Sequence, residues 1–594
     1  MFRQSIVFLL NIGLACAAEL DPNRYLENIK VLASDQLKGR GTGTPEGEKA
    51  AEYIAKQFKH IGLQTVAGSY FQRFPVTIMA KLGPKNRLIW HDNGQKKEAK
   101  FEADFTPLNF SSPGTVSAQV VFAGYGITAP EYSYDDYAGI DAKDKIVVIF
   151  RREPQEFDEK SVFSGKNYTR HSQFDAKATN AKMHGAKAVI MLTDLGSSDL
   201  EKFGKSAGPA NAGIPFIQMK ADSIQKWFDK NLKEIHDEID KDLKPRSFAL
   251  PNTITVDLQA DVQRQIRQVR NVLGYLPGET NEYLIVGAHY DHLGMGDQFS
   301  LDANPSGKIH HGADDNASGT SGVIELARYW TKQPKQKRGI LFMSFSGEEL
   351  GLLGSAYYAE HPLLENARAV AMINMDMIGR IRDGKVFVGG SGTGSSLKKL
   401  LDETKVPDGM RFDLSETAGY GSSDHTSFTI KQIPVLFFFS GLHGDYHRPT
   451  DTWDKINAPE AVKMLGYVSA ITAKLVSETE RPLYVRVMPP TPPGGAQQGS
   501  SGGSAGYGPY FGSIPDFAEP PKGVRFADVR DGSPAGKAGL KAGDIMVSFD
   551  GKDIQNLYDF TYALKGKKPG DEVTVKVLRG GSTIEVQVLL TARK

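Results

Sequence analysis

The stretch of sequence that decides the fold is Leu284-Ile285-Val286-Gly287-Ala288-His289-Tyr290-Asp291-His292. An apolar run of this length predicts a buried strand of an α/β sheet, and in such sheets the chemically active residues lie just beyond the carboxyl ends of the strands. His289 and Asp291 stand at such an end. Because they are two residues apart, they face the same way if the strand continues, which suits a metal ligand and a carboxylate that orients it.

Three further apolar runs end in residues of the same kind. Residues 340–346 are followed by Glu348 and Glu349, residues 370–375 by Asp376, and residues 433–439 by the segment that carries Tyr446 and His447. Two neighbouring glutamates after a buried strand allow one to bind a metal while the other moves a proton. An acid in apolar surroundings, as Asp376 is, costs free energy unless it is paired or metal-bound.

Another candidate ligand stands at a predicted helix start. The segment Gly312-Ala313-Asp314-Asp315-Asn316 leads into the helical residues 323–327. A carboxylate beside a helix N-terminus is stabilised by the helix dipole, and a carboxylate can bridge two cations. Acids at this place are usually helix caps, and the pattern alone does not choose between Asp314 and Asp315. Together, two histidines and three carboxylates at one edge of a sheet indicate a catalytic site with two Zn²⁺ ions, since sulfur ligands are missing.

Composition excludes several classes of protein. A chain of 594 residues is too long for one hydrophobic core and suggests three or four domains. Lys and Arg total 71 against 70 Asp and Glu, so no charge imbalance predicts a nucleic acid or an anionic membrane as partner. Cys16 is the single cysteine, and the chain therefore forms no internal disulfide.

The first 18 residues have the pattern of a secretory signal peptide. A basic start with Arg3 is followed by a short apolar run and by Ala15-Cys16-Ala17-Ala18. The run is too short for a transmembrane helix, so we expect no membrane span after signal removal and a secreted or periplasmic protein. The alternative is lipid anchoring through Cys16, but Gly13 stands where lipoprotein signals usually carry Leu.

The chain order predicts an interrupted α/β domain with two additional units. The predicted parts are the signal peptide (1–18), the N-terminal part of the main domain (19–115), an α/β insertion (116–260), the catalytic part (261–482), a Pro/Gly/Ser-rich linker (483–506) and a last compact unit (507–594). Strands and helices alternate through the catalytic part, which predicts a largely parallel sheet with helices on both faces.

The motif-bearing segments resemble the M28 family of zinc aminopeptidases. The match covers His289-x-Asp291, Gly312-Ala313-Asp314-Asp315, Glu348-Glu349, Asn374-Met375-Asp376 and Tyr446-His447, in the order of the family. The early segments Leu37-Lys38-Gly39-Arg40-Gly41-Thr42-Gly43-Thr44 and Ala50-Ala51-Glu52-Tyr53-Ile54-Ala55 also resemble it. The resemblance implies the zinc exopeptidase fold, a mostly parallel, doubly wound α/β sheet.

The resemblance also implies a role for each residue. Asp315 would bridge the two metals, with His289 and Asp376 on one zinc and Glu349 and His447 on the other. Glu348 would be the general base, and Tyr446 would stabilise the oxyanion of the tetrahedral intermediate. Asp291 would orient His289. Because this ligand set is complete, we assign supporting or structural roles to the other nearby histidines: His292, His310, His311 and His425. The loop from Ser422 to His425 resembles a family loop near the substrate pocket, and its role stays open.

Two further resemblances concern the additional units. The insertion is similar to a protease-associated (PA) domain through Val121-Phe122-Ala123-Gly124-Tyr125-Gly126 and Lys145-Ile146-Val147-Val148. The C-terminal unit is similar to a PDZ domain through residues 532–545, with an expected groove helix near 557–564. The resemblance implies that Tyr510, Phe511, Gly512, Ser513 and Ile514 form the loop that binds a peptide carboxylate.

These expectations define a function and its alternatives. We predict an exported dinuclear zinc aminopeptidase that acts on the N-termini of peptides and proteins, and possible capture of peptide C-termini by the PDZ domain. Related enzymes act as carboxypeptidases, dipeptidases or glutaminyl cyclases. A cyclase works with one metal, whereas all five ligands are present here, which favours hydrolysis. A non-catalytic PA/PDZ binding scaffold is disfavoured because such relatives typically lose the ligands or the base, and Glu348 is present.

Overall fold

The computed structural model describes residues 19–165, 168–197, 199–204, 211–296, 299–302, 304–305, 307–421, 423–487, 509–515, 522–530 and 532–592. The predicted signal peptide with Cys16, residues 488–506 of the predicted linker, and Ser422 lie outside these residues. The chain divides into two compact units: unit 1 contains Met1–Arg73 and Arg270–Val487, and unit 2 contains Phe74–Val269 and Met488–Lys594.

An eight-stranded sheet forms the centre of unit 1. Its strands, in spatial order, are β1 (Phe71–Leu82), β13 (Val262–Leu276), β15 (Gly339–Phe345), β14 (Tyr283–His289), β16 (Ala369–Met375), β19 (Val435–Phe439), β17 (Lys385–Gly389) and β18 (Arg411–Asp413). The four central strands β15, β14, β16 and β19 are parallel, and β17 is parallel to β18, whereas β13 pairs antiparallel with β15 and β17 pairs antiparallel with β19. The predicted mostly parallel α/β sheet is therefore confirmed.

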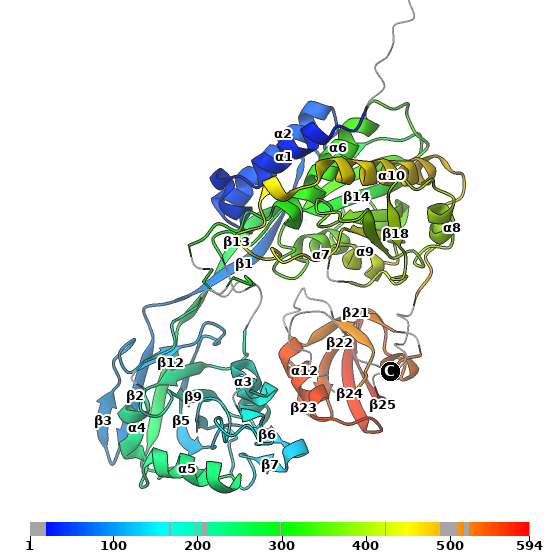
Figure 1. The fold of residues 1–594 in the computed structure, drawn as a ribbon. Coiled ribbons are helices and arrows are strands. Elements are labelled where there is room, and N and C mark those ends of the chain that lie inside the picture. The colour runs from blue at the N-terminus through cyan, green and yellow to red at the C-terminus, as the bar shows by residue number, and fades with distance from the viewer. Residues whose placement is uncertain are drawn as a thin grey trace, which may run out of the picture. The chain divides into compact units, whose positions relative to one another are not determined.

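Helices cover both faces of this sheet. One core cluster joins Leu284 and Val286 of β14 to the helices α1 (Pro22–Leu32), α2 (Pro45–Ile61), α6 (Gly319–Trp330), α8 (Leu397–Asp402) and α10 (Ala458–Ser477). A second cluster joins Tyr283 and Ile285 to α7 (Leu353–Glu360) and α9 (His425–Ile430). Figure 1 shows α1, α2, α6 and α10 together on one side of β14. Because successive strand residues face opposite ways, a strand between two helical layers is apolar throughout.

The N-terminal helices have clear start signals. The hydroxyl of Thr44 accepts a hydrogen bond from the amide of Gly47, and Pro45 occupies the first turn of α2. Asp21 caps α1 by accepting from the amide of Asn23. Such caps satisfy amides that have no partner within the helix. Between the two helices, residues Asp35–Arg40 form a 3₁₀ turn that ends in the buried Arg40.

A nine-stranded sheet forms the larger part of unit 2. The main path runs β3 (Gln95–Glu98), β2 (Arg87–Asp92), β12 (Thr255–Ala260), β5 (Gly114–Phe122), β8 (Ile146–Ile149), β9 (Ala188–Leu192), β10 (Phe216–Met219) and β4 (Phe105–Pro107), and β11 (Phe248–Ala249) pairs with β5. A separate pair contains β6 (Thr128–Ala129) and β7 (Tyr134–Asp135), and the helices are α3 (Phe174–Met183), α4 (Ala221–Ile224) and α5 (Leu232–Asp242). Because β2 pairs with β12 and β4 with β10, residues before 116 also contribute strands to this sheet.

The C-terminal part of unit 2 has its own core. Its strands are β20 (Ser513–Pro515), β21 (Val524–Val529), β22 (Ile545–Phe549), β23 (Lys552–Asp553), β24 (Glu572–Arg579) and β25 (Ser582–Leu589), and its helices are α11 (Pro534–Lys537) and α12 (Leu557–Lys565). The expected groove helix near 557–564 corresponds to α12. Phe511 is buried against Phe526, Phe549 and Phe560, so this side chain belongs to the core.

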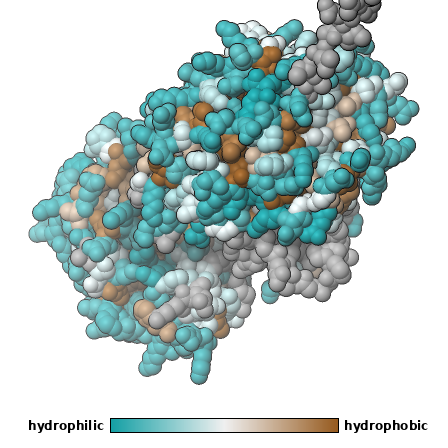
Figure 2. Space-filling view, turned by 45° about the horizontal axis from the view of Figure 1, so that its top comes forward, coloured by the Kyte–Doolittle hydropathy of each residue, from teal (hydrophilic) through white to brown (hydrophobic). Residues whose placement is uncertain are grey.

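The described helices include no candidate for a membrane span. None of them is both long and apolar enough to cross a membrane. On the face drawn in Figure 2, hydrophobic residues occur in small groups among hydrophilic ones.

Candidate metal centre

The carboxyl ends of the parallel strands bring the predicted site residues together. His289 is the last residue of β14, Asp376 directly follows β16, and Glu348 and Glu349 follow β15. Asp315 lies in the kinked turn Ala313–Ser318 that leads into α6, and its own backbone is non-helical (φ -103°, ψ 96°). His447 comes from the segment after β19, in the left-handed region at φ 54°. Parallel strands end at the same edge of the sheet, and this is why residues up to 158 positions apart in sequence meet here.

Four distances define two groups of ligand atoms that share Asp315. Nε2 of His289 lies 3.4 Å from Oδ1 of Asp315 and 3.3 Å from Oδ1 of Asp376. Nε2 of His447 lies 3.3 Å from Oδ2 of Asp315 and 3.1 Å from Oε2 of Glu349. The two oxygens of Asp315 thus face different histidines, as a bridging carboxylate requires.

These distances fit tetrahedral zinc. Two ligand atoms that each lie 2.0–2.1 Å from one tetrahedral Zn²⁺ are about 3.3 Å apart. The carboxylates and imidazoles of the two groups lie at that spacing, 3.1–3.4 Å apart. The donor set, with nitrogen and oxygen but no sulfur, is also the set that zinc takes in catalytic sites.

His292 lies closer to this centre than the sequence suggested. Among the described residues, the groups of histidines and acids close enough to hold a metal are His289 with Asp315 and Asp376, and His292 with Asp315 and Glu349. Nδ1 of His292 lies 2.6 Å from Oε1 of Glu349 and 3.8 Å from Oδ2 of Asp315. The predicted ligand His447 contacts the same two acids through its Nε2 atom. Two histidines therefore approach Glu349, one at each carboxylate oxygen.

The two adjacent glutamates have opposite electrostatic surroundings. Burial raises the pKa of the Glu348 carboxyl well above its usual range, an effect that His289 opposes and Asp376 increases. Although burial acts in the same direction on Glu349, His447 and His292 hold the pKa of that carboxyl well below its usual range. Neighbouring acids whose pKa values are pushed apart suit different tasks, with one remaining an ionised ligand and the other able to carry a proton.

Asp291 supports the centre in a different way from the predicted one. Nδ1 of His289 lies 3.2 Å from the backbone oxygen of Asp291 but 3.9 Å from its carboxylate. The carboxylate accepts hydrogen bonds from the hydroxyl of Thr42, at 2.6 Å, and from the amide of Glu348, at 3.2 Å. In this structure, the side chain of Asp291 therefore positions the segment of Glu348 more directly than it positions His289.

Tyr446 lies against the metal-binding group. Its ring stacks on that of His447 with centroids 3.9 Å apart. Burial raises the pKa of the Tyr446 hydroxyl, and the nearby Asp315 and Glu349 add to the shift. A neutral hydroxyl is a hydrogen-bond donor, which is the state that oxyanion stabilisation requires.

Sequence reasoning missed several residues that hold the ligands. Ser423 donates to Oδ2 of Asp376 at 2.8 Å, and Asn374 donates to the Ser423 hydroxyl at 2.8 Å. Asp451 accepts from the amides of both Asp314 and Asp315. The sequence signals for these residues are the Asn374-Met375-Asp376 motif and the loop from Ser422 to His425, which resemble family segments but do not predict these hydrogen bonds.

Arg40 is buried completely and joins the N-terminal segment to the metal centre. Its guanidinium donates to five backbone oxygens: those of Leu32, Tyr290, His311, Gly312 and Asp315. Tyr290 and His311 flank the loops that carry His292 and Asp315. The five donors of a guanidinium thus connect segments about 250 residues apart in sequence.

His425 has a structural environment. It is 2% exposed, and its ring stacks on Phe437 with centroids 4.3 Å apart and an interplanar angle of 13°. Burial lowers the pKa of His425 from 6.5 to about 3, so the ring stays neutral in the folded protein. The assignment of a structural role to His425 agrees with this packing.

We expect replacement of His425 by Phe to make the protein more resistant to acid. Between pH 6.5 and about 3 the unfolded chain protonates His425 and the folded chain does not, so stability falls as the pH is lowered through this window. The loss is on the order of 5 kcal/mol, since one pKa unit corresponds to about 1.4 kcal/mol. In an acid titration followed by circular dichroism, His425→Phe should unfold at a lower pH than the unchanged protein.

The matched control for this prediction is His60→Phe, because His60 is exposed on α2. An unchanged acid midpoint in His425→Phe, or an equal shift in both variants, would contradict the role assigned to burial.

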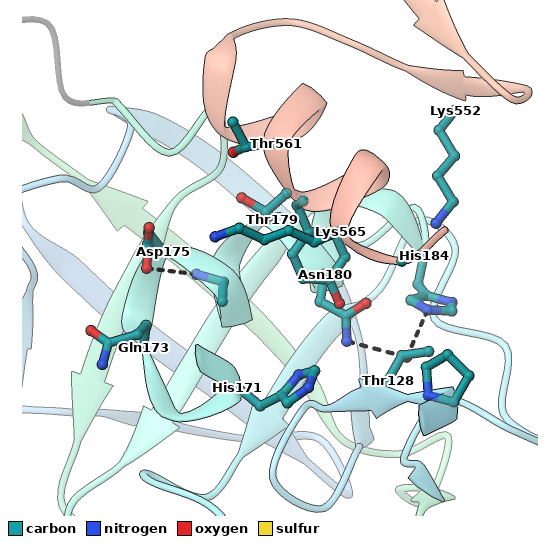
Figure 3. A pocket seen from close by; sticks show the side chains of 14 residues that line it. Thr128, His171, Gln173, Asp175, Thr179, Asn180, His184, Lys552, Thr561 and Lys565 are labelled. Carbon is teal, nitrogen blue, oxygen red and sulfur yellow. Dashed lines mark hydrogen bonds between the residues drawn. The ribbon is translucent and has the colours of Figure 1, made fainter. Parts of the chain in front are cut away.

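Unit 2 contains a cavity, but no group of described residues that could hold a metal lies there. The cavity, about 240 Å³, lies between α3 and α12 (Figure 3). Asn180 and the His184 ring both lie 3.3 Å from the Thr128 hydroxyl on its wall. Nearby, Nζ of Lys182 lies 2.6 Å from Oδ1 of the buried Asp559, and this ion pair connects the two parts of unit 2. The groups of described residues that are able to hold a metal lie in unit 1, so we place the catalytic chemistry there.

Three family models match the chain. Residues 271–472 match "Peptidase family M28", residues 116–227 match "PA domain" and residues 504–590 match "PDZ domain". The three predicted resemblances are confirmed by these matches. The M28 match covers the segments that carry all five predicted ligands.

Several relatives in this comparison are named as aminopeptidases. The chain is 27% identical to aminopeptidase YwaD of Bacillus subtilis, over 61% of this chain and 70% of the relative. It is 24% identical to the probable leucine aminopeptidase 2 of Aspergillus oryzae, over 73% of this chain and 78% of the relative. The match to the probable leucine aminopeptidase of Arthroderma otae, at 28% identity, spans 34% of this chain and 55% of the relative. A solved aminopeptidase from Aneurinibacillus sp. strain AM-1 aligns with a TM-score of 0.45 and 24% identity, over 80% of this chain and 96% of that one.

Proposed function

Because the chain carries a peptidase domain of family M28 together with a PA domain and a PDZ domain, we propose that it is a dinuclear zinc aminopeptidase. The observation that carries the proposal is the pair of ligand groups sharing Asp315, with spacings of 3.1–3.4 Å. His289 and Asp376 would hold one zinc ion, and Glu349 and His447 the other. Bound zinc would polarise the substrate carbonyl and lower the pKa of water.

The side chains around this centre supply the remaining chemistry. Glu348 would accept a proton from the attacking water and pass it to the leaving amine, and its raised pKa suits a group that holds a proton between these steps. Tyr446 would donate its hydroxyl proton in a hydrogen bond to the developing oxyanion. Asp291 would fix the Glu348 backbone through the 3.2 Å bond from its amide.

The test is a panel of aminoacyl-p-nitroanilides, each with a free and an N-acetylated amine, together with the zinc content of the purified protein. We expect release from the free-amine substrates alone and about two zinc ions per chain. Release from N-acetylated substrates would contradict an aminopeptidase. Bound zinc without any release would favour a carboxypeptidase, dipeptidase or glutaminyl cyclase, and absence of zinc would favour a binding scaffold.

Export is a separate part of the proposal, motivated by the pattern of residues 1–18. We expect the mature chain to begin at Glu19 when protein exported by a bacterial host is sequenced from its N-terminus. A chain that begins at a lipid-modified Cys16 would instead establish anchoring.

The PDZ domain gives a second, independent binding activity. Strand β20 lies at the edge of its sheet, and Gly512 before it has a positive φ of 94°, so a peptide that adds as a further strand would lie along β20. Residues 510–514 would supply the backbone amides for its carboxylate. We expect the full chain to bind fluorescent peptides with a free C-terminus better than the same peptides amidated, and equal binding would contradict carboxylate capture.

A further inference from the structure

The histidine that follows Asp291 makes a contact that the proposed reaction does not use. Nδ1 of His292 lies 2.6 Å from Oε1 of Glu349, whereas the other oxygen, Oε2, lies 3.1 Å from Nε2 of His447. We propose that His292 is a positioning residue that holds Glu349 by this hydrogen bond, so that a single carboxylate oxygen faces the metal site shared with His447. The proposal rests on the zinc centre described above and adds a residue to it.

The distance between Nδ1 of His292 and Oε1 of Glu349 distinguishes a positioning residue from a metal ligand. Two ligand atoms on one tetrahedral zinc ion lie about 3.3 Å apart, and the pairs involving His289 and His447 lie 3.1–3.4 Å apart. At 2.6 Å, His292 and Glu349 are too close to share a metal in this way, but they are at a normal distance for a charge-assisted hydrogen bond.

The other ring nitrogen indicates which atom carries the proton. Nε2 of His292 is buried and has no hydrogen-bond partner among the described residues. A proton there would be a buried donor without an acceptor, which costs about 1–3 kcal/mol. A carboxylate oxygen of Glu349 is an acceptor, so Nδ1 is the ring nitrogen that donates in this contact.

The ring is fixed from two sides. A Cβ atom on Gly312 would lie 2.4 Å from Cδ2 of His292, so the ring packs directly on the backbone of the segment that leads to Asp315. The His292 backbone forms a parallel bridge with Gly41, next to the buried Arg40. A donor held this firmly restricts the rotation of the carboxylate that it bonds.

The first metal site has the corresponding arrangement. Asp376 directs Oδ1 towards His289 at 3.3 Å, and its Oδ2 accepts from Ser423 at 2.8 Å. Glu349 and Asp376, which would each bind one zinc ion, thus each have one oxygen near a ligand histidine and one oxygen held by a hydrogen-bond donor. The donor is an imidazole at one site and a hydroxyl at the other, and the two sites therefore differ in how their carboxylates are restrained.

The test compares two substitutions in the full chain by direct metal binding. His292→Phe keeps a flat ring on Gly312 but has no donor, whereas His292→Asn keeps an N–H near the position of Nδ1. We expect His292→Phe to weaken one of two zinc equivalents by about 10- to 100-fold in a chelator competition, and His292→Asn to restore most of this affinity. The visible spectrum of the Co²⁺-loaded protein should change in the Phe variant and return in the Asn variant.

His311→Phe is the matched control, because His311 contacts Asp35 and the backbone of Pro449 instead of a ligand, and its zinc affinities should stay unchanged. Equal weakening in the Phe and Asn variants, or no weakening in either, would overturn the positioning role. If His292→Phe does not fold, His292→Asn still decides, since a large loss of zinc affinity in this variant contradicts a role as donor. A wild-type chain that binds no zinc would overturn the proposed function instead.

Discussion

We expect replacement of Glu348 by glutamine to lower kcat by about 10²- to 10⁴-fold, the range that general acid–base catalysis contributes, without loss of the proposed zinc ions. The amide has nearly the same shape as the carboxyl but cannot accept a proton. Glu348 also lies 3.9 Å from Nε2 of His289, which is further than any predicted ligand pair. Activity on aminoacyl-p-nitroanilides and zinc content, measured on the same samples, check this result.

The neighbouring residue provides the control. Glu349→Gln changes the same kind of side chain one position further along, but we expect it to lose zinc together with activity, because Glu349 faces His447 and is the proposed zinc ligand. If Glu348→Gln lost zinc as well, or if it kept full activity, the division of roles between the two glutamates would be refuted.

The second large effect concerns Arg40. Arg40→Met leaves five backbone oxygens around the metal centre without their donor, and each buried group that loses its partner costs about 1–3 kcal/mol. The total, on the order of 5 kcal/mol, is comparable with the whole stability of many domains. We expect a much lower unfolding temperature of the zinc-free protein, measured by calorimetry, and little soluble product.

Arg40→Lys should keep only part of the stability that Arg40→Met loses, since an ammonium group has three donors in place of five and no planar fork. Arg368→Met is the control. Arg368 is 44% exposed and pairs with Glu365 on the surface, where an ion pair contributes about 0–1 kcal/mol. A similar loss of stability in both variants would mean that the five bonds of Arg40 contribute no more than a surface contact.

The sequence predicted the central sheet because its strands are buried on both faces. The runs that became β14, β15, β16 and β19 are apolar at nearly every position, and this pattern places their carboxyl ends at one edge of the sheet. The predicted metal-binding residues lie at or beyond such ends, or, for Asp315, just before the start of α6. The candidate metal ligands can therefore be predicted from the sequence pattern alone.

The roles of neighbouring acids could not be predicted in the same way. Asp314 and Asp315 look equivalent in the sequence, yet Asp314 accepts from the amide of Gly379 at 2.6 Å and contacts His443 at 3.2 Å, whereas Asp315 faces His289 and His447. The partners that decide these roles, Gly379, His443 and Asp451, lie 65 to 137 residues away. No local pattern contains that information. The same is true of Arg40, whose acceptors are mostly backbone atoms of distant loops.

The points at which the chain enters and leaves the insertion lie next to each other. Strands β1 and β13 are neighbours in the sheet, and at their far ends the amide of Gly83 donates to the oxygen of Asp261 at 2.8 Å. The insertion therefore starts and finishes at what would otherwise be a hairpin. A short Asn-Gly turn could replace everything between these two residues without altering the order of strands in the peptidase sheet. Such a trimmed chain would separate, in one protein, what the catalytic core does alone from what the inserted domain adds.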